Sequence, residues 1–352
     1  MRMFTVSFLV LLSVTFGGCG FGPQALKADQ VDYGRALGEA KKREILSTVV
    51  GLRYADTPGF LDVTQIIAAY TFDASTIAQV NSAPDPSGPR AGASGTVTYS
   101  NHPTFTFTPT AGDNYAKTYI HPLSPAQILP LAQSGVPIDL LLRIAVQSLG
   151  GFANASMLGG PAGNGSPEFF ELIHLLRRLQ LDGAIGIHFE PENSQQQLVV
   201  SLKQAADASP SASTDIKRLR TLLHLAPDSN EFKVVSASSG PDSHSIAVQP
   251  RSLLAILTDL SAEIDIPAED IESGATQPAV KLVGGETRPV LLIHAGKPPR
   301  DAYASIRYRS HQFWIANTDF DTKYALTVVQ SLEAVAQVSD NSHLPVVTVP
   351  AR

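Results

Sequence analysis

The chain has 352 residues, of which 43% are hydrophobic and 16% are charged, and its formal net charge at pH 7 is −6. This balance is typical of a globular protein and excludes a disordered one, and the negative charge argues against nucleic acid as a partner. Cys19 is the only cysteine. No disulfide can form within the chain, so its stability has to come from packing and hydrogen bonds.

The first 18 residues have the pattern of a secretory signal peptide. Arg2 supplies a positive charge, residues 4–16 form an apolar stretch, and Gly17 and Gly18 are small residues at the expected cleavage site. The apolar stretch is shorter than the roughly 20 residues that a membrane-spanning helix needs. We therefore expect residues 1–18 to be removed on export and not to form a transmembrane anchor.

Cys19 follows these glycines directly. The segment Phe16-Gly17-Gly18-Cys19 resembles the lipobox of bacterial lipoproteins, in which the cysteine thiol receives a diacylglycerol before cleavage. The resemblance implies that Cys19 is the lipid attachment site, that acyl chains such as palmitate hold the protein to a membrane, and that its body faces the periplasm. Gly20, in place of the aspartate that retains lipoproteins in the inner membrane, points to the outer membrane. The alternative is an ordinary signal peptide in which Cys19 has no role.

The hydrophobic pattern of the remaining chain predicts an α+β protein with mixed helices and largely antiparallel strands. We expect a tether over residues 19–28, an N-terminal α+β region over 29–203, a C-terminal α+β region over 214–338 and a loose tail over 339–352. The polar stretch 204–214 separates the two regions.

The N-terminal region combines helical repeats with β-branched stretches. Residues 81–95 lack apolar periodicity and are predicted to form an exposed, mobile loop. In chain order we expect a helix over 29–52, a turn over 56–59, strands over 60–72 and 96–108, helices opened by Ser124-Pro125 and Val136-Pro137, the second of them buried over 138–149, and a helix over 166–179 that ends at Asp182-Gly183.

The C-terminal region alternates strand and helix. The expected elements are a helix over 215–225, strands over 232–237 and 245–249, a helix over 251–263, a strand over 289–294, a C-terminal β-hairpin over 302–316 and, after it, a final helix over 319–336.

Two stretches resemble a family of uncharacterised proteobacterial lipoproteins. The first covers Lys42-Arg43-Glu44-Ile45-Leu46 and continues into residues 52–63, Leu-Arg-Tyr-Ala-Asp-Thr-Pro-Gly-Phe-Leu-Asp-Val. The second covers Pro299-Arg300-Asp301-Ala302-Tyr303, Arg307-Tyr308-Arg309 and residues 313–315 and 319–323. The resemblance extends loosely through 105–150. It implies an envelope location and carries no known activity.

No catalytic motif is present in the sequence. It has no Gly-x-Ser-x-Gly nucleophile elbow, no His-Glu-x-x-His zinc helix and no phosphate-binding loop. We therefore assign no catalytic residue, no metal and no cofactor. His188, Glu190 and Glu192 alternate along a possible strand and could face one way, as a metal site or an acid–base pair requires. Pro191 and the polar residues after it favour a solvated strand end instead.

Arg53 and Asp56 flank the predicted helix stop. An ion pair between them could hold the helix end onto the following strand, and an arginine suits a helix C-terminus. The functional alternative makes Arg53 a clamp for a carboxylate or phosphate ligand. We favour the structural pair.

The hairpin over 302–316 is the predicted interaction surface. With Ser310 and His311 at the turn, Arg309 would face Gln312 and Arg307 would face Trp314. Alternation then places Tyr303, Arg307, Arg309 and Trp314 on the outward face, where arginine and aromatic residues are typical of binding hot spots. The alternative is that the helix over 319–336 covers this face and makes Trp314 a core residue.

These features together predict a lipid-anchored envelope protein that acts by binding, as a structural or assembly component with an envelope protein as partner. One alternative is a periplasmic hydrolase of a cell-wall or glycan substrate, with Asp319 and Asp321 as acid and base. Another is a carrier of an apolar ligand. The hydrolase requires a deep pocket with two or more carboxylates, and the carrier requires a large closed apolar cavity.

Overall fold

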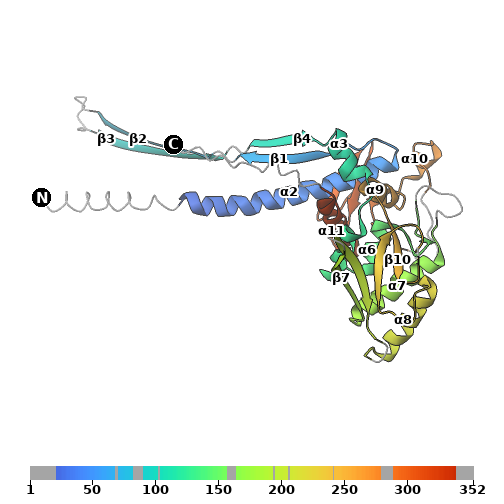
Figure 1. The fold of residues 1–352 in the computed structure, drawn as a ribbon. Helices are drawn as coiled ribbons and strands as arrows, with labels where there is room; N and C mark the ends of the chain where they lie inside the picture. The colour runs from blue at the N-terminus through green and yellow to red at the C-terminus, as the bar shows by residue number, and fades with distance from the viewer. Residues whose placement is uncertain are drawn as a thin grey trace. The chain divides into compact units, whose positions relative to one another are not determined.

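A computed structural model describes residues 21–67, 70–81, 90–101, 104–156, 164–192, 195–204, 207–240, 242–278 and 288–337. Its helices and mostly antiparallel strands confirm the predicted α+β class (Figure 1). The described residues fall into two compact units. The larger unit joins the chain up to Pro58 to Thr118–Ala336, and the smaller unit is built on Gly59–Lys117. Residues 1–20, which include the predicted signal peptide and Cys19, and the predicted tail 339–352 lie outside the described residues.

The larger unit contains a six-stranded sheet in the order β6-β5-β10-β9-β8-β7, antiparallel except for the parallel pair β9–β10. Its strands are β5 (Val146–Leu149), β6 (Phe152–Ala153), β7 (Ile185–Glu192), β8 (Gln195–Leu202), β9 (Glu231–Ser236) and β10 (Ser245–Pro250). These strands come from both of the predicted regions, 29–203 and 214–338. The structure therefore groups the chain differently from that division.

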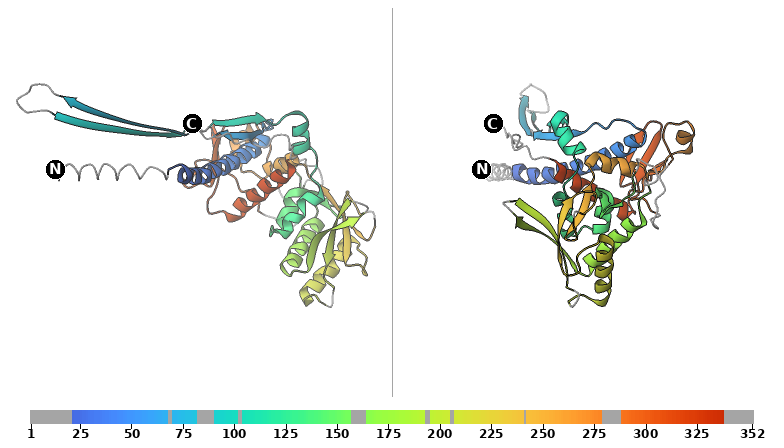
Figure 2. Two further views of the ribbon diagram at one scale, coloured as in Figure 1. Left: turned by 60° about the vertical axis from the view of Figure 1, so that its left-hand side comes forward. Right: turned by 45° about the vertical axis from the view of Figure 1, so that its right-hand side comes forward.

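Three helices lie on one side of this sheet, α6 (Ile138–Ala145), α7 (Pro167–Leu181) and α8 (Pro210–Leu223) (Figure 2). Along β9, Phe232 and Val234 are buried whereas Glu231 and Lys233 are exposed. This alternation is typical of a sheet that packs on a core with one face and meets solvent with the other.

The remaining elements of the larger unit are α2 (Phe21–Arg53), α4 (Pro125–Ile128), α5 (Pro130–Gln133), α9 (Leu253–Ser261), α10 (Ala268–Glu272), β11 (His294–Ala295), β12 (Ala304–Tyr308), β13 (His311–Ile315) and α11 (Phe320–Ala336). β11, β13 and β12 form a three-stranded antiparallel sheet. The predicted hairpin and last helix are confirmed. No helix among the described residues is both long and apolar enough to cross a membrane.

The predicted buried helix over 138–149 is wrong in its last four residues. α6 ends at Ala145, and residues 146–149 form β5, which pairs with β10. The reason is tertiary: Asn154 Nδ2 donates to the carbonyls of Arg143 and Val146, both at 2.8 Å, and the Arg251 N–H donates to Ala145 O. These donors satisfy carbonyls that the end of a helix leaves free, so the chain turns into the sheet there. The predicted burial holds, since Leu141, Val146 and Leu149 are buried.

Two other predicted elements differ because side chains supply hydrogen bonds. α8 begins at Pro210 and not at 215, because the Ser209 hydroxyl accepts from the Ala212 N–H and caps the helix within the predicted linker 204–214. The predicted strand 289–294 is reduced to β11. Glu263 accepts from the Val290 N–H and Thr322 Oγ1 from the Leu292 N–H, so these backbone groups are not paired in a ladder.

α2 is a continuous helix of 33 residues, and the predicted tether over 19–28 is therefore wrong where the structure describes it. After Pro23, the residues Gln-Ala-Leu-Lys-Ala are all good helix formers. Residues 31–40 are mostly exposed, whereas Leu46, Val49 and Val50 are buried. The helix ends at Arg53 and a turn follows at residues 54–55, two residues before the turn predicted over 56–59.

A buried carboxylate connects α2 to α11. Lys41 Nζ lies 2.7 Å from Glu333 Oε1, and the Tyr119 hydroxyl donates to the same oxygen at 3.1 Å. Burial raises the pKa of Glu333, and the ammonium of Lys41 and the Tyr119 hydrogen bond offset part of this effect. The pair joins residues that are 292 positions apart in the sequence.

The smaller unit consists of two pairs of strands, a short helix and the start of a π-helical turn. β1 (Leu61–Ile67) pairs with β4 (Thr104–Pro109), and β2 (Tyr70–Asn81) pairs with β3 (Arg90–Asn101). The helix is α3 (Gly112–Tyr115), and the turn Ala116–Ile120 follows it. The predicted strands 60–72 and 96–108 are each divided between two of these strands.

The predicted mobile loop 81–95 is wrong for Asn81 and for residues 90–95. Asn81 ends β2, and residues 90–95 belong to β3, opposite Thr76–Asn81. Their small side chains have no apolar period, but a strand ladder is made by backbone groups and does not require one. Residues 82–89 lie outside the described residues.

Candidate functional site

The hairpin β12–β13 has a different register from the predicted one. Tyr308 pairs with His311, Arg307 with Gln312 and Ser305 with Trp314. The turn is therefore formed by Arg309 and Ser310, and Arg309 has a positive φ of 51°. The predicted pairing of Arg307 with Trp314 is wrong. Because every partner moved by two positions, the same residues still share a face.

The face of the hairpin that carries Tyr308 and Phe313 lies against the end of α2. Tyr54 stacks on Tyr308 with ring centroids 5.6 Å apart and meets the edge of Phe313 at 6.4 Å. The Tyr308 hydroxyl donates to Asp56. The segment after α2 and the hairpin, which are far apart in the sequence, thus contact each other directly.

Charged groups surround these rings. The Tyr54 hydroxyl donates to Asp270 Oδ2 at 2.6 Å, and His311 Nε2 lies 3.3 Å from that same oxygen. The guanidinium of Arg309 lies 4.6 Å from the centre of the Tyr54 ring and 3.9 Å from Asp56. We name this cluster the hairpin junction; its members are Tyr54, Asp56, Asp270, Tyr308, Arg309 and His311.

Both tyrosines of the hairpin junction are held in the neutral form. Burial, with the hydrogen bond to Asp56 as the second cause, raises the pKa of Tyr308 to about 12. Burial and then the hydrogen bond to Asp270 raise the pKa of Tyr54 well above its usual value near 10. The folded state therefore keeps these protons at a pH where the unfolded chain loses them, so stability falls as pH rises above 10.

We expect Tyr54→Phe to lower the free energy of unfolding by about 2 kcal/mol at pH 8, because the Asp270 carboxylate loses the hydroxyl that donates to it. The loss should shrink between pH 10 and 12, since phenylalanine has no proton to lose there. Urea denaturation at pH 8 and pH 11 measures both effects. Tyr303→Phe is the matched control, because the Tyr303 hydroxyl makes no hydrogen bond to the described residues. Equal losses in the two variants would contradict the prediction.

The predicted ion pair between Arg53 and Asp56 does not form. Arg53 is 3% exposed, and its Nη2 donates to the Gln277 carbonyl at 2.6 Å. Burial lowers its pKa. Asp56 faces the hairpin, where Tyr308 and Arg309 contact it. The turn after the helix directs the two side chains to different neighbours, which spacing along the sequence does not reveal.

The four residues of the predicted interaction patch have different surroundings. Arg307 and Arg309 are exposed. Trp314 is half-buried and stacks on His294, with ring centroids 4.5 Å apart, because β11 places His294 opposite it. The ring of Tyr303 lies 4.2 Å from Lys42 Nζ of α2. The exposed part of the patch therefore consists of the two arginines.

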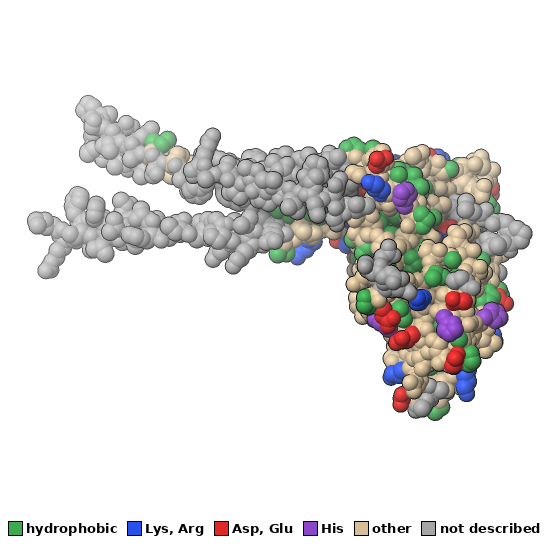
Figure 3. Space-filling model, in the orientation of Figure 1, with side chains coloured by type: hydrophobic (Ala, Val, Ile, Leu, Met, Phe, Trp, Pro, Cys, Tyr) green, Lys and Arg blue, Asp and Glu red, His purple; other side chains and the backbone are tan. Residues whose placement is uncertain are grey.

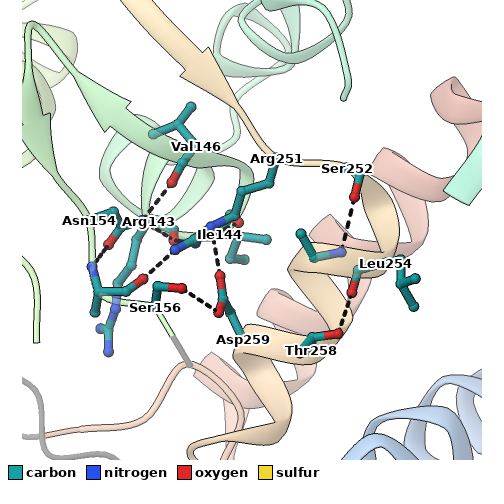
Figure 4. Close-up of polar contacts among 12 residues, drawn as sticks. Arg143, Ile144, Val146, Asn154, Ser156, Arg251, Ser252, Leu254, Thr258 and Asp259 are labelled. Carbon is teal, nitrogen blue, oxygen red and sulfur yellow. Dashed lines mark hydrogen bonds and ion pairs between the residues drawn. The ribbon is translucent and has the colours of Figure 1, made fainter. Parts of the chain in front are cut away.

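A second cluster lies around Arg251, between α6 and α9 (Figure 4). Arg251 is 5% exposed, and its Nε lies 2.8 Å from Asp259 Oδ2. Its other nitrogens donate to the carbonyls of Arg143 at 3.0 Å, Ile144 at 3.2 Å and Ala155. Burial lowers the pKa of Arg251, and Asp259 opposes this effect. The guanidinium is surrounded by protein acceptors, as in a structural contact.

A small cavity borders this cluster and is lined by two carboxylates, Asp259 and Glu263. Its volume is about 30 Å³, the scale of one water molecule. Both carboxylates are already engaged, Asp259 by Arg251 and Glu263 by the Val290 N–H at 2.5 Å. Burial raises the pKa of Glu263, although Arg143 and this hydrogen bond oppose it.

The acidic pair of the hydrolase alternative is also engaged. Arg288 contacts both Asp319 and Asp321, and Thr322 donates to Asp319 through its hydroxyl at 2.6 Å and its N–H at 3.2 Å. Burial raises the pKa of Asp319, but the bonds from Thr322 and Arg288 outweigh it and leave the pKa lowered. Asp319 thus helps to start α11.

His188 and Glu190 lie together at the edge of the sheet, as their alternation predicts. Pro191 does not end the strand there: β7 continues to Glu192, because a proline is tolerated on an edge strand. The acidic residue that joins His188 and Glu190 is Glu231 of β9. Sequence reasoning missed Glu231, since its proximity depends on the strand order.

A scan against protein-family models, a search of curated proteins and a search of solved structures each found no match to this chain. The function is therefore argued from the geometry of the described residues.

Proposed function

We propose that the protein is a lipid-anchored protein of the bacterial cell envelope, attached through Cys19 to the outer membrane. In this proposal it acts by binding an envelope protein, as a structural or assembly component without catalytic activity, and belongs to the family of uncharacterised lipoproteins that its two stretches resemble.

The course of α2 carries this proposal. The helix begins two residues after Cys19, and its last turns are buried in the larger unit. At about 1.5 Å per residue, 33 residues extend over roughly 50 Å. Such a helix is suited to hold a folded body at a set distance from a membrane, which a scaffold needs and a freely moving enzyme does not.

The hairpin junction supplies a surface for a partner. Arg307 and Arg309 are exposed on the hairpin, and the guanidinium of Arg309 lies over the ring of the buried Tyr54. Arginine and tyrosine are the residues most enriched at binding hot spots. The net charge of the chain is negative, whereas these two exposed arginines are positive, and they favour an acidic group on the partner.

The two alternatives have less support. The cavity beside Arg251 is too small for a glycan, and its carboxylates are engaged. A second cavity, lined by apolar residues of α6, α7 and the sheet, also has a volume of about 30 Å³. An apolar ligand larger than a water molecule does not fit there.

Substitution of Cys19 tests the proposed anchor. We expect Cys19→Ser to move the protein from the membrane fraction to the soluble fraction or to leave an uncleaved precursor, because the thiol that carries the lipid is absent. Gly20→Asp is the matched control: it keeps the thiol and should remain in membranes, with a shift toward the inner one. Membrane fractionation after a high-salt wash, with mass spectrometry of the N-terminus, gives the result. A Cys19→Ser protein that stays in the washed membranes would disprove lipid anchoring.

A further inference from the structure

Three metal-ligating side chains converge on the solvent-facing side of the six-stranded sheet. His188 and Glu190 belong to β7, and Glu231 begins β9. One ligand atom of each lies within 4.8 Å of those of the other two, and His188 Nε2 lies 3.2 Å from Glu190 Oε1. Histidine and acidic side chains also lie near one another on the face of the larger unit drawn in Figure 3. The three residues come from strands, which hold their positions more precisely than loops do.

The register explains how Glu231 reaches across the middle strand β8. Glu231 lies in one row with Ser201 of β8 and Gly186 of β7. Both of these residues are small, and a Cβ at Gly186 would come within 2.6 Å of Ser201 Oγ. The side chains of Gly186 and Ser201 are therefore short enough for the long Glu231 side chain to extend over them toward His188.

We propose that His188, Glu190 and Glu231 bind a divalent transition-metal ion, with zinc as the best fit. Zinc accepts imidazole nitrogen and carboxylate oxygen at about 2.0–2.2 Å, which places tetrahedral ligand atoms about 3.4 Å apart. Small rotations of the two flexible glutamates bring the present spacing to that value. Calcium and magnesium prefer oxygen ligands alone, so the imidazole selects against them.

Charge supports the same assignment. Glu190 and Glu231 repel each other at this separation, and a divalent cation between them removes the repulsion. Lys233 lies on the same face, in one row with Val199 and His188. A positive charge on this face opposes the binding of a cation. Lys233→Gln should therefore bind zinc more tightly than the parent protein.

Titration with zinc chloride tests the site in the full chain carrying Cys19→Ser, because a free thiol would itself bind zinc. Isothermal titration calorimetry should give one site per chain. Loss of a residue that only hydrogen-bonds to a metal ligand already costs about 10–100-fold in metal affinity. His188→Gln and Glu231→Gln remove a ligand itself, so each should weaken zinc binding at least about tenfold. His244→Gln and Glu272→Gln are the matched controls, since both residues are exposed and lie outside the cluster.

Thermal unfolding without zinc checks that all variants fold alike, and with zinc it should show a higher Tm for the parent and the controls only. Histidine ring signals of His188 should shift on titration in an NMR spectrum. The proposal is overturned by two outcomes. One is a parent protein that takes up no zinc; the other is equal uptake by the parent and His188→Gln, which would mean adventitious surface binding only.

Discussion

Replacing Arg251 with methionine is expected to lower the free energy of unfolding by about 3–5 kcal/mol, the usual cost of breaking a buried ion pair from one side. The change leaves Asp259 without its cation, removes the Arg251 contacts to the carbonyls of Ile144 and Ala155, and leaves the Arg143 carbonyl with Asn154 alone. Those carbonyls belong to the end of α6 and to the chain after β6, so the end of α6 is then held only by Asn154 and by the main-chain N–H of residue 251. Urea denaturation followed by circular dichroism measures the loss.

The double variant Arg251→Met with Asp259→Leu separates the charge from the carbonyl contacts. It removes the uncompensated carboxylate and should recover part of the stability, while the freed carbonyls keep it below the parent. Arg218→Met is the control, because its pair with Glu171 is exposed. A single Arg251→Met variant as stable as Arg218→Met would show that the cluster does not hold α6 in place.

The second large effect is expected from Lys41→Met, which removes the cation beside Glu333. Glu333 is 5% exposed and would keep only the Tyr119 hydroxyl, so we expect a loss of about 2–3 kcal/mol at pH 8. The pKa of Glu333 is already raised by burial and should rise further without Lys41. The folded variant then binds a proton more tightly than the unfolded chain, so its stability is regained as pH falls.

Urea denaturation of the parent and of Lys41→Met at pH 5 and pH 8 tests this sign. The difference between the two proteins should be smaller at pH 5. Arg35→Met is the matched control on the same helix: its pair with Asp32 is exposed, at 3.4 Å, and should contribute no more than about 0.5 kcal/mol. A loss in Lys41→Met that is the same at both pH values would exclude Glu333 as its cause.

The sequence predicted most of the elements of the larger unit because their signals are local. Ser166-Pro167 opens α7 and Asp182-Gly183 ends it, and the alternation of residues 302–316 predicted the hairpin. The residues on each face of the hairpin were predicted correctly, although their cross-strand partners were not. Faces depend only on alternation, whereas register depends on the turn, and Arg309 adopts a positive φ that no local signal indicates.

The errors have a common physical origin in contacts between distant residues. The pattern of residues 138–149 suits a buried helix and a buried strand equally well, and the outcome depends on Asn154 and Arg251. Glu263 and Thr322 similarly take the backbone donors that would have extended β11. A single sequence does not reveal that Glu263 and Thr322 accept hydrogen bonds from these backbone groups.

The same limit applies to the candidate sites. His188 and Glu190 were found because they alternate on one strand, but Glu231 joins them only through the order β9-β8-β7. The hairpin junction brings together residues 216 and 252 positions apart, as in the contacts of Tyr54 with Asp270 and of Tyr308 with Asp56. The hairpin itself was predicted, whereas its contacts with the end of α2 and with Asp270 were not.

The continuity of α2 has a mechanical consequence. A flexible tether between a lipid and a folded domain stretches under load before the domain feels any force. In the proposed lipid-anchored state, a helix that starts two residues after Cys19 and ends in the core has no such slack. Tension between the membrane and a bound partner would pass along α2 to the contact of Lys41 with Glu333 and on to Tyr54 at the hairpin junction. The strength of the link under load is then set by these interior contacts.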